Sequence, residues 1–215
     1  MVKIAIVGSN GKMGKLLVSK LKNNYTLIEI DKNDSIEKAI DAEMVIDFST
    51  ARNSVKTAKW CADNYKKLII GATGQSVYEI NKIINASKKT PIMIAGNFSV
   101  GIAKLKIMLN EAVCKDLLSI VILEKHHHAK IDKPSGTALE LEKELKNLTA
   151  CPIEILSIRG GKEIGIHEIS FYFENEVIRL SHQAFSRDAF ANGVIKAVDF
   201  MKNQSVAQLY DVKNI

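Results

Sequence analysis

The fold is decided by the segment Lys3-Ile-Ala-Ile-Val-Gly-Ser-Asn-Gly-Lys-Met-Gly14, close to the start of the chain. Its apolar beginning predicts a buried strand, and the apolar period of Lys12–Leu21 predicts a helix. A glycine-rich turn between a strand and a helix lets the backbone approach a pyrophosphate at the positive end of the helix. Asn10 occupies the second glycine position of the usual G-x-G-x-x-G spacing, so an ordinary tight turn is the alternative.

Beyond this segment, short apolar runs alternate with helical segments through the first half of the chain. The predicted elements are the strands Thr26–Ile30, Met44–Phe48, Leu68–Ile70 and Pro91–Ala95, and the helices Ser35–Ile40, Thr50 (as N-cap) to about Asp63, and Val77–Ala86. Strands that alternate with helices of about ten residues predict a parallel sheet covered on both faces. We therefore expect a Rossmann-like, doubly wound α/β domain over residues 1–98.

After Asn97 the pattern changes. The predicted elements are helices over about Val100–Lys115, Ala138–Leu148 and Asp188–Met201, and strands over Leu117–Glu124, Glu154–Ile158, Ile166–Phe173 and Val177–His182. The alternation of Ile169, Phe171 and Phe173 is typical of a half-buried strand. We expect a second, α+β domain over residues 99–186, with a mostly antiparallel sheet and helices on one face. Two domains without a long linker predict a cleft between them.

The composition narrows the class of protein. The 215 residues are 47% hydrophobic and 25% charged, as in an ordinary globular protein, and the net charge of +6 suits anionic ligands. The lysines are scattered, and no basic run with interleaved aromatic residues points to nucleic acid. The three cysteines are far apart, which speaks against a disulfide framework and a cysteine zinc site. Without a signal-peptide pattern or a membrane-length apolar run, we expect a soluble cytoplasmic protein that binds no membrane.

The densest polar segment is Glu124-Lys-His-His-His-Ala-Lys-Ile-Asp-Lys-Pro-Ser-Gly-Thr-Ala138. His126 and Lys130 are close enough to share a pocket, and both residue types deliver protons and attract carboxylates. The Ser135-Gly-Thr137 turn offers a hydroxyl N-cap and free backbone N–H groups to an anion. The segment indicates an enzyme for a small acidic substrate; the alternative is a solvated basic loop with a capped helix.

Three consecutive histidines also raise the question of a metal ion. Neighbouring residues in a strand point to opposite faces of the sheet, so the three imidazoles cannot converge on one ion. The remaining histidines, His167 and His182, do not supply an evident set of remote ligands. We expect no metal site.

Three further stretches follow predicted strands of the first domain. Asp31 ends the second strand, where a carboxylate accepts the ribose hydroxyls of a dinucleotide, and the neighbouring Lys32 suits a 2′-phosphate instead. Both NADH and NADPH therefore stay open. Gly71-Ala-Thr-Gly74 and Ala95-Gly-Asn-Phe98 follow later strands, at the sheet edge where open α/β sheets bind ligands. Ordinary strand-ending turns are the alternative for each.

Taken in order, several blocks resemble the 4-hydroxy-tetrahydrodipicolinate reductase (dihydrodipicolinate reductase) family. Besides the segment 124–138, they are Gly8-x-x-Gly11-x-Met13-Gly14, Asp47-Phe-Ser49, Gly71-Ala-Thr-Gly74, Asn97-Phe-Ser-Val-Gly101, Ser157-Ile-Arg-Gly-Gly161, Gly165-Ile-His167 and Ser186-Arg-Asp-Ala-Phe-Ala-Asn-Gly193. The resemblance implies reduction of the dehydrated form of 4-hydroxy-tetrahydrodipicolinate, a cyclic dicarboxylate, by NADH or NADPH in the diaminopimelate route of lysine biosynthesis. It also implies a homotetramer formed through the second domain's sheet, and a C-terminal segment 187–215 that completes the first domain.

The resemblance also assigns roles to individual residues. It implies that His126 is the catalytic histidine and Lys130 the proton donor, although the two roles can be exchanged. It places His127 against the substrate and Gly136 and Thr137 around a substrate carboxylate. The implied dinucleotide contacts are Gly8, Ser9, Asn10, Gly11, Lys12, Met13, Asp31, Lys32, Gly71, Ala72, Thr73, Ala95, Gly96, Asn97 and Phe98.

The chain departs from the family pattern in three places. Lys12 stands where the family usually carries Arg, Lys133 replaces the usual Ala before Pro134, and few residues separate Asp31 from Asp47. The short segment between Asp31 and Asp47 trims the nucleotide domain and leaves the preference between NADH and NADPH open, whereas Lys12 replaces a bidentate fork by a point charge. Two other functions are alternatives: another nicotinamide-dependent oxidoreductase of an amino or keto acid, and a non-catalytic dinucleotide sensor.

Overall fold

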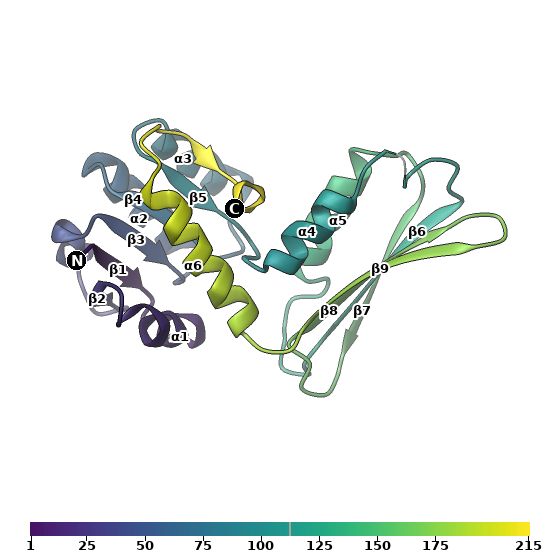
Figure 1. Cartoon of the computed structure of the whole chain (residues 1–215), viewed down its shortest axis with the longest axis horizontal. Helices are drawn as coiled ribbons and strands as arrows, with labels where there is room; N and C mark the ends of the chain where they lie inside the picture. Colours follow the sequence, from purple (N-terminus) through teal and green to yellow (C-terminus); the bar gives the residue numbers. More distant parts are fainter. Residues whose placement is uncertain (112) are drawn as a thin grey trace. The chain divides into compact units, whose positions relative to one another are not determined.

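Two separate sheets organise the chain in the computed structural model, which describes residues 1–111 and 113–215. Unit 1 comprises Met1–Phe98 and Phe190–Ile215, and unit 2 comprises Ser99–Ala189 (Figure 1). Within the described residues, none of the helices has the length and apolar character needed to span a bilayer.

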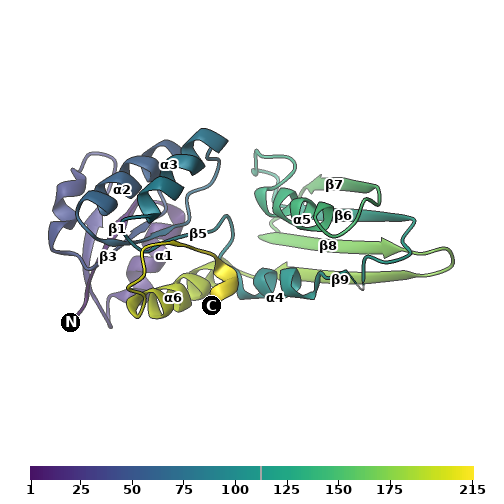
Figure 2. The same ribbon diagram turned by 90° about the horizontal axis from the view of Figure 1, so that it is seen from above.

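Unit 1 is built on a six-stranded parallel sheet with the strand order β10-β5-β4-β3-β1-β2. Its strands are β1 (Lys3–Val7), β2 (Thr26–Ile30), β3 (Met44–Asp47), β4 (Lys67–Ile70), β5 (Ile92–Ile94) and β10 (Leu209–Tyr210). Its helices are α1 (Lys12–Leu21), η1 (Ile36–Asp41), α2 (Ala51–Asp63), α3 (Val77–Ser87), α6 (Asp188–Lys202) and η2 (Val212–Asn214). Helices α2 and α3 lie on one face of this sheet, and α1 and α6 lie on the other (Figure 2).

The strands of unit 1 are buried on both faces, as their continuous apolar runs require. In β3, for example, neither Val45 nor Ile46 exposes any surface, although their side chains point to opposite faces. The predicted Rossmann-like domain is confirmed. Strand β1 pairs with β2 on one side and with β3 on the other, so the chain order reverses there. Such a reversal opens a ligand crevice at the carboxyl ends of the strands.

Two details of unit 1 differ from the sequence prediction. The connection between β2 and β3 is a 3₁₀-helix, η1, which is shorter than an ordinary crossover helix. The edge strand β10 was not predicted. It has only two residues, Leu209 and Tyr210, and it exists because they pair with β5, which no local pattern announces.

Unit 2 contains a four-stranded sheet with the order β7-β6-β8-β9. Its elements are β6 (Ser119–His126), β7 (Ile153–Arg159), β8 (Gly165–Tyr172), β9 (Val177–Ala184), α4 (Val100–Met108) and α5 (Gly136–Lys146). Both helices lie on one face of this sheet (Figure 1). The core between them contains Leu105 and Leu141 from the helices and Ile120, Ile169 and Phe171 from the strands. The predicted α+β unit with a mostly antiparallel sheet is confirmed.

Within this mostly antiparallel sheet, β7 runs parallel to β6, because α5 forms a crossover between them. Two local expectations for unit 2 were wrong. Helix α4 ends at Met108 instead of Lys115, and the side chain of Asn110 accepts a hydrogen bond from the N–H of Val113, which favours a turn. Residue 112 of that predicted helix lies outside the described residues. Strand β6 extends to His126, two residues beyond its predicted end.

Candidate active site

His126 is the last residue of β6, two residues beyond the predicted end of that strand. It is paired across the sheet with Arg159 of β7, and its carbonyl accepts a hydrogen bond of 3.0 Å from the N–H of Gly160. Glu124 lies two residues earlier, so its side chain shares the same face of the sheet. The strand thus fixes the backbone of both residues.

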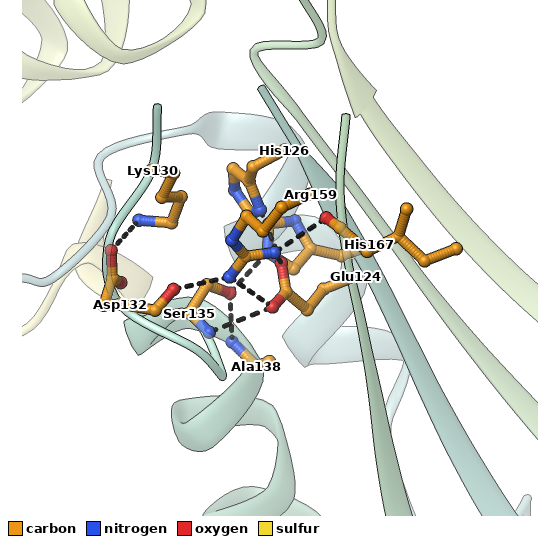
Figure 3. Close-up of polar contacts among 9 residues, drawn as sticks. Glu124, His126, Lys130, Asp132, Ser135, Ala138, Arg159 and His167 are labelled. Atoms are coloured by element: carbon orange, nitrogen blue, oxygen red, sulfur yellow. Dashed lines mark hydrogen bonds and ion pairs between the residues drawn. The ribbon is translucent and has the colours of Figure 1, made fainter. Parts of the chain in front are cut away.

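Glu124 is completely buried and accepts hydrogen bonds from three different segments (Figure 3). Arg159 donates to both carboxylate oxygens, with Nη1–Oε2 and Nη2–Oε1 distances of 2.8 and 2.7 Å. The Nδ1 atom of His126 lies 2.5 Å from Oε2, and the N–H of Ser135 donates to Oε1 at 3.2 Å. The two hydrogen bonds from Arg159 form a bidentate ion pair with Glu124, a strong type of charge-assisted hydrogen bonding.

The contacts decide the ionisation state of Glu124. Burial favours the neutral acid, but hydrogen bonds led by those from Arg159 outweigh it and lower the pKa of Glu124 to about 2. A carboxylate only accepts hydrogen bonds, so the Nδ1 atom of His126 must carry a hydrogen. In the neutral imidazole the lone pair is then on Nε2. Burial lowers the pKa of His126, partly offset by Glu124, which favours the neutral ring at neutral pH.

Lys130 is connected to the same cluster through Asp132. Its Nζ atom lies 2.7 Å from Oδ1 of Asp132, and the carbonyl of Asp132 accepts a hydrogen bond of 2.5 Å from Nη2 of Arg159 (Figure 3). Burial opposes ionisation of Asp132, but the hydrogen bond from Lys130 outweighs it and lowers the pKa of that carboxyl. The structure thus brings His126 and Lys130 to one cluster, with Arg159 joining them.

The N-terminus of α5 borders this cluster. Ser135 is its N-cap, as predicted, and its Oγ atom accepts a hydrogen bond of 3.3 Å from the N–H of Ala138. The same Oγ atom lies 3.2 Å from Nε2 of His167, a buried residue of β8. Thr137 is nearly buried in the first turn, whereas no other part of the described chain lies within 4 Å of the place that a side chain on Gly136 would take. Open space before a helix N-terminus suits an anion.

His127 follows β6 directly, and its backbone N–H donates a hydrogen bond of 2.8 Å to the carbonyl of Glu163. His128 is the third histidine of the segment, and its Nδ1 atom lies 3.3 Å from the carbonyl of Gly161. The backbone of His127 and the ring of His128 thus contact residues 161–163, whereas the ring of His126 contacts Glu124. Among residues 1–111 and 113–215, no group of three or more His, Cys, Asp or Glu side chains is arranged to hold a metal ion.

Unit 1 contains a cavity of about 510 Å³ at the carboxyl ends of β1, β2 and β3. Four predicted dinucleotide contacts line it, namely Gly8, Gly11, Asp31 and Lys32. Asn10 is close by, because its Nδ2 atom donates a hydrogen bond of 2.5 Å to Asp31. The cavity is also lined by residues that sequence analysis missed as contacts, and these are Asp34, Ile36, Phe48, Ser49, Thr50, Asn53, Lys56 and Thr57.

The close approach of backbone segments explains the glycines of the turn. Gly8 has a φ of +82°, and a Cβ there would lie 3.0 Å from the carbonyl of Phe48. A Cβ on Gly14 would lie 2.1 Å from the Gly8 carbonyl oxygen, which requires glycine at the start of α1. The turn is therefore built for close backbone contact, the property that pyrophosphate binding needs.

Phe48 connects the remaining predicted dinucleotide segments. A Cβ on Gly71 would lie 2.1 Å from its ring, and the ring of Phe98 has its centroid 6.0 Å from that of Phe48. The N–H of Ala95 donates to the carbonyl of Ile70, which places the two loops side by side. The remaining predicted contacts do not line the cavity; they are Ser9, Asn10, Lys12, Met13, Gly71, Ala72, Thr73, Ala95, Gly96, Asn97 and Phe98.

Three residues of the cluster around Glu124 and His126 were not assigned a role from the sequence. They are Glu124, Arg159 and His167, from β6, β7 and β8. All three lie in blocks that carry the family resemblance. The spacing of Glu124 and His126 on one strand face was the only local signal for their contact, whereas Arg159 and His167 reach the cluster through strand pairing.

Family models of known proteins match most of the chain. Family models described as dihydrodipicolinate reductase, N-terminus, and dihydrodipicolinate reductase, C-terminus, match residues 21–98 and 101–215. The glycine turn precedes the first of these matches.

Individual relatives agree with the family models. The 4-hydroxy-tetrahydrodipicolinate reductase of Thermosipho africanus (strain TCF52B) is 35% identical over 223 residues, which cover 100% of this chain and 97% of the relative. That of Campylobacter fetus subsp. fetus (strain 82-40) is 35% identical over 250 residues, with 99% and 98% covered. A dipicolinate-bound dihydrodipicolinate reductase from Paenisporosarcina sp. TG-14 has the same fold, with a TM-score of 0.79, 22% identity, and 100% and 99% covered. The chain belongs to the dihydrodipicolinate reductase family.

Proposed function

We propose that this protein reduces the dehydrated form of 4-hydroxy-tetrahydrodipicolinate to tetrahydrodipicolinate with NADH or NADPH, in the diaminopimelate route of lysine biosynthesis. Relatives that carry this reductase name match the chain over its full length. The observation that carries the proposal is the cluster around Glu124, which joins His126, the Lys130 loop and the N-terminus of α5. A proton donor and an anion-binding helix end thus share one site, as a dicarboxylate imine requires.

The residues of unit 1 fit a nicotinamide dinucleotide. The cavity has the backbone turn for a pyrophosphate at Gly8 and Gly11 and a carboxylate, Asp31, at the end of β2 for ribose hydroxyls. When bound, the reduced cofactor supplies the hydride. The chain's own part is to hold the dinucleotide at this edge of the sheet and to bind and protonate the substrate in unit 2.

In the proposed reaction, Lys130 delivers the proton that the ring takes up after hydride addition. Its ammonium group carries a proton and attracts a dianionic substrate, and Asp132 restricts its position. His126 polarises the ring or relays the proton, and Glu124 holds its orientation. Gly136 and Thr137 bind one substrate carboxylate at the N-terminus of α5. His127 contacts the substrate from the loop after β6.

A different oxidoreductase of an amino or keto acid would use unit 1 equally well but would leave this cluster without a purpose. A thermal-unfolding experiment with pyridine-2,6-dicarboxylate tests the substrate class. We expect the dicarboxylate to raise Tm, and to raise it further when a reduced dinucleotide is also present. Stabilisation by the dinucleotide alone, with no effect of the dicarboxylate under either condition, would favour the sensor or the other oxidoreductase.

We propose that the protein assembles as a homotetramer through the sheet of unit 2. The helices cover one face of this sheet, and the other face carries apolar side chains such as Leu156 and Ile158, each 45% exposed. An exposed apolar sheet face of this kind commonly pairs with a copy of itself. Sedimentation of the wild type and of Leu156→Lys tests this assembly, since the substitution should reduce the mass of the particle.

We also propose that the protein acts in the cytoplasm. Its cysteines Cys61, Cys114 and Cys151 are all unpaired, which suits a reducing compartment. Fractionation of the source cells tests the location, and recovery of the protein outside the cytoplasmic fraction would contradict it.

A further inference from the structure

The carboxylate of Glu124 has no exposed surface, and its hydrogen bonds come from three segments that are distant in sequence. Arg159 reaches it from β7, His126 from β6, and the N–H of Ser135 from the start of α5. A buried charge is tolerated only when its hydrogen bonds are satisfied, so the position of each donor depends on the others.

The same contacts extend to the Lys130 loop. The Nη2 atom of Arg159 donates both to Glu124 and to the carbonyl of Asp132, whose side chain binds Lys130. His126 and the start of α5 therefore contact the pair of Glu124 and Arg159 directly, and Lys130 is linked to it through Asp132. Neither member of the pair has a proposed part in the chemistry itself.

The pair also determines which nitrogen of His126 is presented to a ligand. Because Glu124 accepts from Nδ1, the opposite nitrogen, Nε2, is left for the substrate. A Cβ on Gly165 of β8 would lie 3.0 Å from this Nε2 atom, so the absence of a side chain at Gly165 leaves space beside Nε2.

We propose that Glu124, held by Arg159, is the positioning residue of the reductase site: it sets the tautomer of His126 and, through Arg159, the place of the Lys130 loop. This inference rests on the proposed function. It assigns no contact with the substrate to either residue, and it explains why a buried ion pair lies at the carboxyl end of β6.

The substitution Glu124→Gln keeps the shape but removes one of two acceptor oxygens. With the amide oxygen at the Oε2 position, the NH2 group would face the donors of Arg159 and Ser135, and in the opposite orientation it would face the Nδ1–H of His126. We expect kcat to fall about 100-fold while KM for the dinucleotide stays within about twofold. Glu142→Gln is the matched control, since it breaks the ion pair with Lys146 at the C-terminal end of α5. We expect this control to keep kcat.

A double-variant cycle distinguishes positioning from a merely structural role. Because Glu124 acts partly through His126 and partly through the Lys130 loop, Glu124→Gln should lower kcat about tenfold less in a His126→Ala background than in the wild type. Equal losses in both backgrounds, or a folded Glu124→Gln enzyme with wild-type kcat, would overturn the inference. Arg159→Lys keeps the charge but loses the fork, and we expect a fall in kcat of about tenfold.

The wild-type protein provides a test that does not depend on the folding of any variant. In nitrogen-15 spectra of histidine-labelled protein near neutral pH, we expect His126 to carry its hydrogen on Nδ1. A hydrogen found on Nε2 alone would contradict the inference. If the wild type has the predicted tautomer but shows no reductase turnover, the proposed function fails and the positioning of His126 by Glu124 stands.

Discussion

The rings of His126 and His167 meet edge to face, with their centroids 5.1 Å apart and their planes at 73°. Both residues are buried. Burial lowers the pKa of each, and for His167 the repulsion from His126 contributes further, so that its pKa is about 3. The folded protein therefore keeps His167 neutral over the whole range in which an ordinary histidine would take up a proton.

This relationship predicts that acid destabilises the protein. The pKa of His167 falls from 6.5 to about 3 on folding, so the unfolded chain binds a proton that the folded chain does not. The neutral, buried His167 therefore contributes its full share to the free energy of unfolding above pH 6.5, and this contribution is lost as the pH falls towards 3. The free energy of unfolding should decrease by up to about 1.4 kcal/mol per pH unit in this window.

Urea unfolding at a series of pH values checks this prediction with His167→Gln and, as a control, His128→Gln at an exposed position. The first variant should show a shallower dependence on pH between 6.5 and 3, and the control should follow the wild type. Equal slopes for all three proteins would contradict the prediction. At lower pH Glu124 acts in the same direction, because its pKa falls from 4.5 to about 2 on folding.

Lys130→Ala is expected to lower kcat by about 100-fold or more, because it removes the proposed proton donor. Lys130 is not among the residues that line the dinucleotide cavity, so dinucleotide affinity should change little. Steady-state kinetics together with dinucleotide titration measure both quantities. Equal losses in kcat and in dinucleotide affinity would exclude the proposed role.

Gly136→Ala tests the carboxylate site at the N-terminus of α5. Among the described residues, no other part of the chain lies within 4 Å of the added methyl group, so the variant should fold with a Tm at least as high as that of the wild type. A bound carboxylate would meet that methyl group, and we expect KM for the substrate to rise about tenfold. Gly160→Ala is the matched control, because its methyl group is equally free of contacts in the same unit. Similar KM values for the two variants would place the carboxylate elsewhere.

Asp31 should influence the choice between NADH and NADPH. Its carboxylate, held by Asn10, lines the cavity beside Lys32 and would repel a 2′-phosphate. We expect Asp31→Ala to raise the ratio of kcat/KM for NADPH over NADH by about tenfold. Lys32→Ala should lower that ratio. As a control, Asp41→Ala, at an exposed residue that pairs with Lys3, should leave the ratio unchanged. An unchanged ratio in both cavity variants would remove Asp31 and Lys32 from cofactor selection.

Local patterns predicted most of unit 1. The strand Lys3–Val7 and the helix Lys12–Leu21 were predicted with their observed ends, because apolar period and glycine turn are both local signals. Thr50 was likewise predicted as an N-cap, and its side chain accepts from the N–H of Asn53. Strand β10 was missed, since two residues carry no periodicity and only pairing with β5 defines them.

The candidate site was predictable only in part. His126, Lys130 and Ser135 belong to one short segment of the sequence, so their proximity in space could be anticipated. Arg159 is far from them along the chain, and its contact with Glu124 arises from the parallel pairing of β6 and β7. That pairing depends on the crossover through α5, and no local spacing of polar residues reveals it.

The most direct test of the proposed activity is turnover with substrate generated in place. A synthase would form the unstable 4-hydroxy-tetrahydrodipicolinate from pyruvate and aspartate semialdehyde, and oxidation of NADH and NADPH would be followed in separate reactions. We predict that oxidation requires both the synthase product and this protein, and that Lys130→Ala nearly abolishes it. If the folded wild-type protein binds dinucleotide but oxidises neither cofactor when the product is present, it is not this reductase.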